Sequence, residues 1–335
     1  MSQALGLAAT KPVSRREFME LSAGLAGSAL LGRGSRSASP ARARVAVARA
    51  PRYSLEIKGI LAPYFRQFGL SLRGKSVLLK PNIVDCHGAG HHIFTDPTVL
   101  AAAIELFGDL GAKVRVAEAS GLRRDTNTFL FDSGYKEILA KYSVEFVDLN
   151  LDEVEKVNIP SNLTGLNYLY VPRTVVQADF VVSMPKMKTH HWAGVTLSLK
   201  NMLGVLPGIK YGWPKNRLHT IGLHEAIVDI GHTVRPSFAI IDGIFGIEGN
   251  GPLFGDNKFA GVLIMSDDFL AADTVAAQIM GINPRKIEYL RLASRPAGDA
   301  VPALGNARDI EVLGAPIASV RQDFKLLDEF KRLRL

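Results

Sequence analysis

Ala178-Asp-Phe-Val-Val-Ser-Met184 runs directly into Pro185-Lys-Met-Lys-Thr-His-His-Trp-Ala-Gly-Val-Thr-Leu-Ser-Leu-Lys-Asn201. The first segment has the length and β-branched content of a buried parallel strand. The second crowds two histidines and three lysines into what the pattern predicts to be a turn and a helix. Because open α/β sheets bind ligands beyond the carboxyl ends of their strands, we expect the cationic segment to form the floor of a site.

A strand, a helix and a second strand are predicted upstream of this stretch. Residues 75–84 form the first strand, and a helix follows with Asp96 as its cap and Pro97 in its first turn. Val114-Arg-Val-Ala-Glu118 is the next strand. The order predicts a βαβ unit with a right-handed crossover.

The remaining pattern completes an α/β fold. It predicts a mostly parallel, Rossmann-like sheet flanked by helices, with a smaller inserted or C-terminal subdomain. Residues 151–174 are expected to be irregular or a β-ribbon, and residues 202–217 to be a lid or rim loop. Further strands are expected at 145–149, 169–171, 180–184, 238–241, 262–265 and 309–313, and later helices at 132–142 and 270–280.

The N-terminus predicts export. Ser14-Arg15-Arg16-Glu17-Phe18-Met19 precedes an apolar stretch, Leu21 to Leu31, which is typical of a twin-arginine signal and too short to span a bilayer. We therefore expect residues 1–43 to be a signal peptide and linker and 44–335 to be one α/β domain. The expected partner is the twin-arginine translocase, the expected location is the periplasm or another exported compartment, and no integral membrane span is expected in the mature chain.

Charge and cysteine content exclude several classes of protein. The chain carries a net charge of +8, but residues 1–43 hold six basic and two acidic residues, which leaves 34 basic and 30 acidic residues in the remainder. No basic run is interleaved with aromatic residues, so we expect no nucleic-acid partner. Cys86 is the only cysteine, which excludes an internal disulfide and a multi-cysteine cluster.

Polar side chains follow four predicted strands and are expected to converge on an anionic small molecule. Lysine and arginine beside glycine-exposed amides suit phosphate or carboxylate groups. The predicted binding residues are Lys80, Asn82, Arg123, Lys186, Lys188, Asn201 and Asn250. Strand capping by residues that face water is the alternative for each of them.

Lys200 and His190 are the predicted catalytic centre. Apolar residues flank Lys200, so burial could lower the pKa of its ammonium and make it a nucleophile, although a packed stem with a solvated head remains an alternative. His190 and His191 are neighbours and are expected to point apart, so that only one enters the site; His190 is the predicted acid/base. His219 is a candidate metal ligand, with a surface or capping role as the alternative, because its five-residue separation from His224 is not helical ligand spacing.

Two acidic segments complete the candidates. Residues 242–252 are predicted to be a glycine-rich loop in which Asp242 and Glu248 orient a ligand, a metal or Lys200. Their glycine spacing does not match a dinucleotide fingerprint. Asp268 and Asp273 are predicted to cap a helix rather than to act in catalysis.

At these residues the chain resembles the domain of unknown function 362 (DUF362) family. The likeness rests on Lys80-Pro-Asn82, Ser183-Met-Pro-Lys-Met-Lys-Thr-His190, Ser198-Leu-Lys-Asn201, Ile241-Asp-Gly243 and Glu248-Gly-Asn-Gly-Pro252. The resemblance implies an α/β protein. Some members carry ferredoxin-type cysteine clusters, which this chain lacks, so no iron-sulfur cluster is expected.

A more distant likeness is to the nickel-pincer lactate racemase family. His190, Trp192-Ala-Gly194 and Lys200 match its cofactor-bearing segment, and Ala119-Ser-Gly-Leu-Arg-Arg124 is similar to its Ala-Thr-Gly-Thr-His-Arg motif. The resemblance implies a lysine-tethered organic cofactor, a metal, and proton or hydride transfer at a hydroxy acid. Arg123 stands where that family has a catalytic histidine.

Two functions follow as hypotheses. The first is an exported enzyme, an isomerase or oxidoreductase, that transfers a proton or hydride on an anionic small molecule, with an organic or metal cofactor as electron sink. The second is a non-catalytic periplasmic protein that binds an anionic ligand reversibly.

Overall fold

The computed structural model describes residues 42–335 except 86–91, 122–125 and 214. The predicted twin-arginine signal, Cys86 and Arg123 therefore lie outside the described residues. Residues 40–335 form one compact unit. Within the described residues, no helix is both long and apolar enough to cross a membrane.

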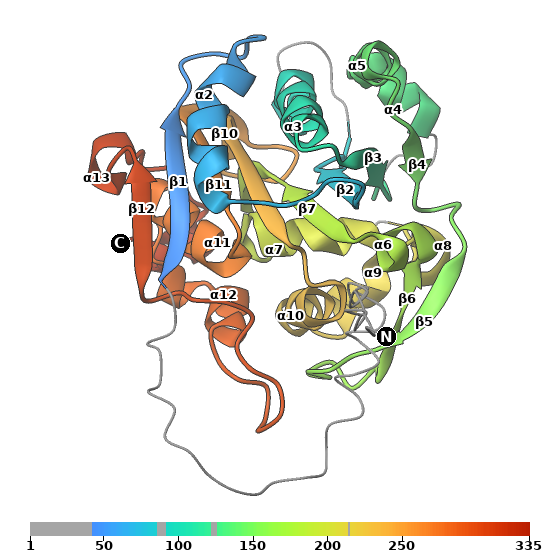
Figure 1. Cartoon of the computed structure of the whole chain (residues 1–335). Coiled ribbons are helices and arrows are strands. Elements are labelled where there is room, and N and C mark those ends of the chain that lie inside the picture. The colour runs from blue at the N-terminus through green and yellow to red at the C-terminus, as the bar shows by residue number, and fades with distance from the viewer. Residues whose placement is uncertain (1–41, 86–91, 122–125, 214) are drawn as a thin grey trace, which may run out of the picture. The chain divides into compact units, whose positions relative to one another are not determined.

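A large mixed sheet forms the centre of this unit (Figure 1). Its strands run in the order β12-β1-β11-β10-β7-β2-β3-β4, and a hairpin of β8 and β9 is attached to β10. The pairs of β2 with β3 and β7, of β3 with β4, of β10 with β7 and β8, and of β1 with β12 are parallel. The bounds are β1 Ala43–Arg49, β2 Ser76–Pro81, β3 Lys113–Glu118, β4 Phe146–Asp148, β7 Phe180–Met184, β8 Lys186–His190, β9 Gly194–Thr196, β10 Phe238–Glu248, β11 Asp256–Ser266 and β12 Ile310–Gly314. The predicted α/β class is confirmed.

Helices cover both faces of the sheet (Figure 1). α2 and α3 pack on one face with the apolar layer that holds Leu79 and Phe107, and α10, α11 and α12 pack on the other with the layer that holds Leu78 and Ile241. The side chains of the adjacent residues Leu78 and Leu79 thus point to opposite faces of the sheet and pack in different apolar layers. This is expected for a strand with helices on both faces. The helices are α2 Ile57–Phe65, α3 Pro97–Asp109, α4 Thr126–Asp132, α5 Tyr135–Tyr142, α6 Arg173–Gln177, α7 Ser198–Asn201, α8 Gly208–Tyr211, α9 Asn216–Thr220, α10 Leu223–Val234, α11 Phe269–Ile279, α12 Glu288–Ala293 and α13 Ile317–Val320.

Local signals in the sequence placed several elements well. Asp96 caps α3, because its Oδ1 accepts from Thr98 N at 2.8 Å, and Asp268 caps α11 by accepting from Ala271 N at 2.9 Å. Residues 151–174 contain a two-stranded antiparallel ribbon, β5 Val154–Asn158 and β6 Tyr168–Pro172. The predicted helix at 132–142 is broken at Gly134, whose φ of 78° is left-handed.

The cationic segment is not the predicted turn and helix. Residues 186–196 form the hairpin β8–β9, and only Ser198–Asn201 are helical. β8 lies beside β10 in parallel, with Asp242 opposite Lys186. The segment is a strand because it pairs with β10, although its local sequence favours a turn.

The predicted glycine-rich loop at 242–252 is also wrong in its first half, because β10 continues to Glu248. A Cβ on Gly246 would lie 2.5 Å from Met187 O, and one on Gly243 would lie 2.8 Å from Met187 Cε. These glycines therefore let β8 approach β10 closely, and are packing residues of a strand rather than a ligand loop.

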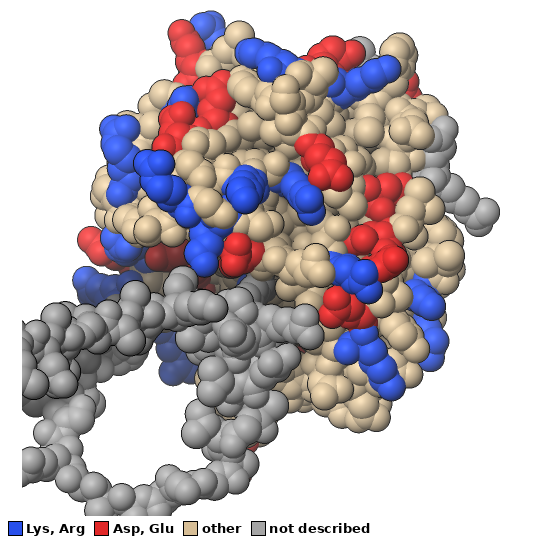
Figure 2. All heavy atoms as spheres, turned by 45° about the vertical axis from the view of Figure 1, so that its right-hand side comes forward, with Lys and Arg blue, Asp and Glu red and all other residues tan. Residues whose placement is uncertain are grey.

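Acidic and basic side chains intermix on the face turned toward the viewer in Figure 2. Ion pairs at the surface of the described residues include Arg173 with Glu155 at 3.4 Å and Lys58 with Asp109 at 2.9 Å.

Candidate active site

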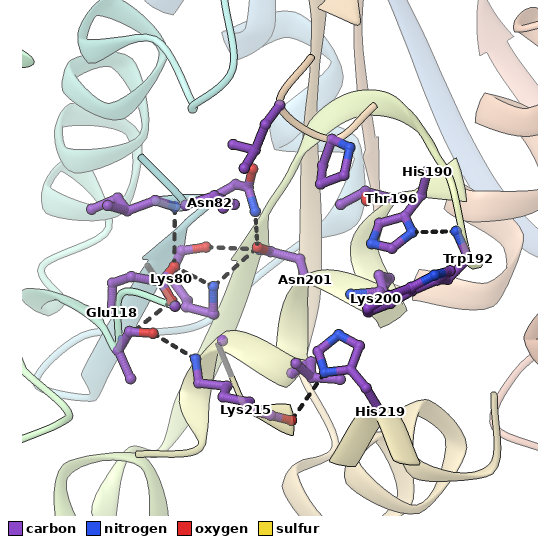
Figure 3. A pocket seen from close by; sticks show the side chains of 18 of the residues that line it. Lys80, Asn82, Glu118, His190, Trp192, Thr196, Lys200, Asn201, Lys215 and His219 are labelled. Carbon is purple, nitrogen blue, oxygen red and sulfur yellow. Dashed lines mark hydrogen bonds and ion pairs between the residues drawn. The ribbon is translucent and has the colours of Figure 1, made fainter. Parts of the chain in front are cut away.

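A pocket of about 200 Å³ opens where the carboxyl ends of β2 and β3 meet the β8–β9 hairpin and α7 (Figure 3). A cavity of this size suits a small organic molecule. Its lining residues are Lys80, Asn82, Ile83, Val84, Glu118, Ala119, Gly121, His190, His191, Trp192, Thr196, Lys200, Asn201, Leu203, Gly204, Lys215, His219, Pro252 and Leu253.

One wall is a buried ion pair held by an amide. Lys80 Nζ pairs with Glu118 Oε2 and donates to Asn201 Oδ1 at 3.0 Å. Asn82 Nδ2 also donates to Asn201 Oδ1, at 3.1 Å, so α7 is tied to the end of β2. Burial lowers the pKa of Lys80 and raises that of Glu118, and each charge opposes the shift of the other. Among the described residues that line the pocket, Glu118 is the only carboxylate and is already paired, and the others are basic or neutral.

α7 places Lys200 in the pocket. Its first two backbone amides, at Ser198 and Leu199, donate to the two carboxylate oxygens of Asp273 on α11 at 2.7 and 2.9 Å. Asp273 is fully buried, and burial raises its pKa to about 8. Capping by Asp273 was predicted for the helix that contains it, which is α11. The structure shows that Asp273 instead caps the first turn of α7.

The Lys200 amine has neither a hydrogen-bond partner nor an ion-pair partner among the described residues. The residue is 8% exposed, and its side chain lines the pocket beside His190 (Figure 3). Burial, and then the positive charge of Lys80, lower the pKa of Lys200 to about 8. About a tenth of the amine is therefore neutral at pH 7, where an ordinary lysine is almost wholly protonated.

His190 is held in one tautomer by its own turn. Its Nδ1 accepts from Trp192 N at 3.0 Å and from Ala193 N at 3.2 Å. A nitrogen that accepts two N–H groups carries no proton, so the neutral ring carries its proton on Nε2. Burial, and then the charge of Lys200, hold the pKa of His190 well below its usual range. This geometry does not suit the predicted acid/base role, because neither nitrogen has a lone pair to offer a substrate; it suits a neutral hydrogen-bond donor.

His191 and His219 have the opposite arrangement. Nδ1 of His191 donates to Gly251 O at 2.8 Å, and Nδ1 of His219 donates to Lys215 O at 2.9 Å. Each ring therefore leaves a lone pair on Nε2, which can accept a proton or bind a metal. Both His190 and His191 line the pocket, with ring centroids 4.9 Å apart, so the expectation that only one would enter the site is wrong. The chain turns immediately after His190, where β8 ends, and the alternation of a strand no longer applies.

Lys215 was not singled out from the sequence. It is 2% exposed, and its Nζ donates to Ala119 O at 2.6 Å. Burial lowers its pKa to about 7, although the charge of Glu118 opposes the shift. Lys215 lies just before α9, in a segment expected to be an irregular rim. No signal in the sequence indicates this, and only the fold shows that the Lys215 side chain points into the protein and reaches Ala119, which directly follows β3.

Five predicted residues lie elsewhere. Lys186 and Asp242 form a buried pair at 2.5 Å, which Tyr53 completes by donating to Asp242 Oδ1 at 3.0 Å. Lys188 is buried and donates to Ile93 O at 2.7 Å. Glu248 accepts from Lys325 N at 2.9 Å. None of these four residues lines the pocket, and neither does Asn250.

The pocket does bring together Lys80, Asn82, His190, Lys200, Asn201 and His219. In the described part of the chain, no group of three or more histidine, cysteine or acidic residues could hold a metal ion.

Three comparisons place the chain among known proteins. The family model described as "Domain of unknown function (DUF362)" matches residues 77–278. The "Thylakoid-associated protein sll1697" of Synechocystis sp. is 29% identical over 231 residues, which are 66% of this chain and 68% of that protein.

A solved structure of the lactate racemase apoprotein from Thermoanaerobacterium thermosaccharolyticum is also similar, at 15% sequence identity and a TM-score of 0.42. The match covers 72% of this chain and 57% of that one, which is less than two thirds of its length. A likeness at this level carries no argument about activity.

Proposed function

This chain belongs to the domain of unknown function 362 family, and from the chemistry of its pocket we propose that it is an enzyme for a small anionic organic molecule. The reaction we propose is proton transfer at a carbon that bears an oxygen function. The observation that carries the proposal is the buried Lys200 amine, which faces the pocket and has no partner among the described residues.

Charge and size select the ligand. Lys80, Lys200 and Lys215 line the cavity, and the one carboxylate among its described lining residues, Glu118, is already paired with Lys80. The positive charges of these lysines attract a carboxylate or phosphate group that enters the cavity, and the attraction is stronger there than in water because the dielectric constant is low. Ile83, Leu203 and Leu253 give the cavity apolar walls that fit a short carbon chain. A small carboxylic acid meets both conditions.

Two amines with lowered pKa values supply the proton chemistry. A general base works best when its pKa is near the working pH, and burial brings Lys200 to about 8 and Lys215 to about 7. Lys200 would take the proton, and His190 Nε2–H would donate a hydrogen bond to the oxygen whose charge grows as the proton leaves.

The site also suits a lysine-tethered organic cofactor. Lys200 would be its attachment point, and the Nε2 lone pair of His219 would be available to a metal that it carries. Such a group would supply an electron sink and extend the proposal from proton to hydride transfer. A mass spectrum of protein purified under native conditions from its exported pool tests this, since added mass on Lys200 that survives denaturation identifies a tether.

Reversible binding without turnover is the second candidate. It is favoured by the geometry of the pocket, in which Lys80, Asn201 and the His190 ring are all held by hydrogen bonds to other protein groups. Preorganised donors of this kind reduce the cost of binding and do not require a reaction.

Location forms part of the proposal. The twin-arginine motif at Arg15 and Arg16 supports export of the protein through the twin-arginine translocase, to the periplasm or an equivalent compartment. The thylakoid-associated relative is compatible with an exported protein.

Deuterium exchange tests the reaction without knowledge of the product, at C2 of a 2-hydroxy acid and at C3, next to the carbonyl, of a 2-oxo acid. Short 2-hydroxy and 2-oxo acids are incubated with the protein in D2O and followed by NMR. We expect exchange with the native protein, loss of at least a hundredfold in Lys200→Met, and native rates in Lys113→Met, which removes an exposed lysine on β3.

Exchange that persists in Lys200→Met would overturn the proposal. Thermal stabilisation by these acids without any exchange would favour the binding protein instead.

A further inference from the structure

We propose that the ligand is an anionic aldehyde or ketone and that Lys200 binds it covalently as an imine. This inference rests on the proposed function, because it names the substrate class of the same pocket. It is carried by three groups that line the pocket: the Lys200 amine, the His190 ring and the Thr196 hydroxyl.

Lys200 differs from the other buried lysines in the described residues. Lys80 pairs with Glu118, Lys186 pairs with Asp242, Lys188 donates to Ile93 O, and Lys215 donates to Ala119 O. Their amines are occupied by protein acceptors. Lys200 alone among these five has no such acceptor, so its nitrogen is available to a carbon electrophile.

The atoms beside Lys200 match a carbonyl oxygen. His190 carries its proton on Nε2, since Nδ1 accepts from two backbone amides, and Nε2 has no acceptor among the described residues. Thr196 Oγ1 is buried and also lacks a hydrogen-bond partner there. A buried hydroxyl without a partner is costly. His190 lines the pocket and its Nε2–H can donate to the oxygen of a bound molecule, and Thr196, which also lines the pocket, can supply a second donor.

A simple alcohol or an alkyl ammonium fits less well. An ammonium would meet the charges of Lys80, Lys200 and Lys215, and the one carboxylate among the described lining residues is already paired with Lys80. An alcohol could accept from His190 but would leave the amine unused. An anionic carbonyl compound fits all of these groups. Lys80 and Lys215 would attract its anionic group. His190 and Thr196 would donate hydrogen bonds to its carbonyl oxygen, and the Lys200 amine would add to its carbonyl carbon.

The chemistry balances without an oxidant or a reductant. The neutral Lys200 amine adds to the carbonyl carbon, which forms a C–N bond and a carbinolamine. The C–O bond then breaks, and the oxygen leaves as water with one proton from the nitrogen and one from a nearby acid such as the Lys215 ammonium. The protonated imine then withdraws electrons from the adjacent carbon. With Lys200 held in the imine, the Lys215 amine, neutral after it has given its proton to the departing water, would take the proton from that carbon in place of Lys200.

Borohydride reduction tests the inference, because it converts an imine into a stable secondary amine. The full chain is incubated with glyoxylate, pyruvate or 2-oxobutyrate, reduced, and analysed by intact mass and peptide mapping. We expect one adduct per chain on Lys200, loss of that adduct in Lys200→Arg, and at least a tenfold slower trapping rate in His190→Phe. Lys113→Met is the matched control and should be trapped at the native rate.

A parallel thermal shift with lactate, which has the anion but no carbonyl group, separates this inference from the proposed function. Stabilisation by lactate and deuterium exchange without any Lys200 adduct would overturn the imine and leave the enzyme proposal standing. Equal trapping of Lys200→Arg would also overturn the imine, because the adducts would then lie on other lysines. Absence of stabilisation, exchange and adduct would overturn both.

Discussion

At the scale of single residues, the groups around Lys200 determine how much of its amine is neutral and therefore reactive. The dependence of the Lys200 reaction rate on pH tests this. Burial and the charge of Lys80 lower its pKa to about 8 from 10.5. Half of the amine is therefore neutral at about pH 8 and about nine tenths at pH 9, and the neutral fraction falls about tenfold for each pH unit below pH 7. We expect the rate of borohydride trapping to rise from pH 6 and to level off near pH 9, as measured by intact mass after short incubations.

A trapping rate that keeps rising to pH 10 would mean that Lys200 behaves as an ordinary solvated lysine. Trapping of free Nα-acetyl-lysine by the same acids provides the reference curve, which should continue to rise over this range because nothing lowers the pKa of that amine.

At the scale of elements, the short 3-10 turn Met202–Val205 that follows α7 forms part of the pocket wall. A Cβ on Gly204 would lie 2.3 Å from Glu118 Oε1 and 2.6 Å from Lys80 Nζ. We expect Gly204→Ala to force the ion pair apart, to destabilise the fold by about 1–3 kcal/mol, and to abolish stabilisation by small acids. Urea unfolding with and without lactate measures both effects.

Gly59→Ala is the matched control. Gly59 lies inside α2, where an added Cβ would meet nothing within 4 Å. Alanine is the better helix former by about 0.5–1 kcal/mol, so this variant should gain stability and keep its response to ligand. If the two variants had similar free energies of unfolding and were stabilised equally by lactate, the claim that a side chain at position 204 disrupts the Lys80–Glu118 pair would be contradicted.

At the scale of the whole molecule, β1 limits where the proposed signal could be cut. β1 lies between β11 and β12 in the sheet, and Val45, Ala46, Val47 and Ala48 are fully buried. Removal of β1 would expose this apolar surface and two strand edges. We expect a chain that starts at Arg42 to unfold cooperatively with the stability of the full chain, and a chain that starts at Ala50 to fail to do so, as circular dichroism during heating would measure.

A folded, cooperative chain from Ala50 onward would contradict this role of β1. N-terminal sequencing of the protein from the compartment to which we propose that it is exported is an independent check, since cleavage beyond the first residues of β1 is incompatible with the pairing of Val45 to Val312 and Ser266.

The sequence by itself determined the elements whose signals are local. Phe180–Met184 is a strand because an unbroken apolar run can be buried on both faces, and Asp96 caps a helix because its carboxylate reaches an amide two residues away. The lysines and histidines of 186–200 likewise indicated a basic site, and six of the predicted residues line one pocket.

Only the tertiary structure decided how those residues are used. The β8–β10 pairing joins Lys186 to Asp242, 56 positions along the chain, and so removes both from the pocket, while Lys215 reaches Ala119 from 96 positions away. The tautomer of His190 depends on a turn, and the low pKa of Lys200 depends on burial by segments distant in sequence. Charge pairing, desolvation and tautomer choice depend on distances in space, and the order of residues in a single sequence does not contain those distances.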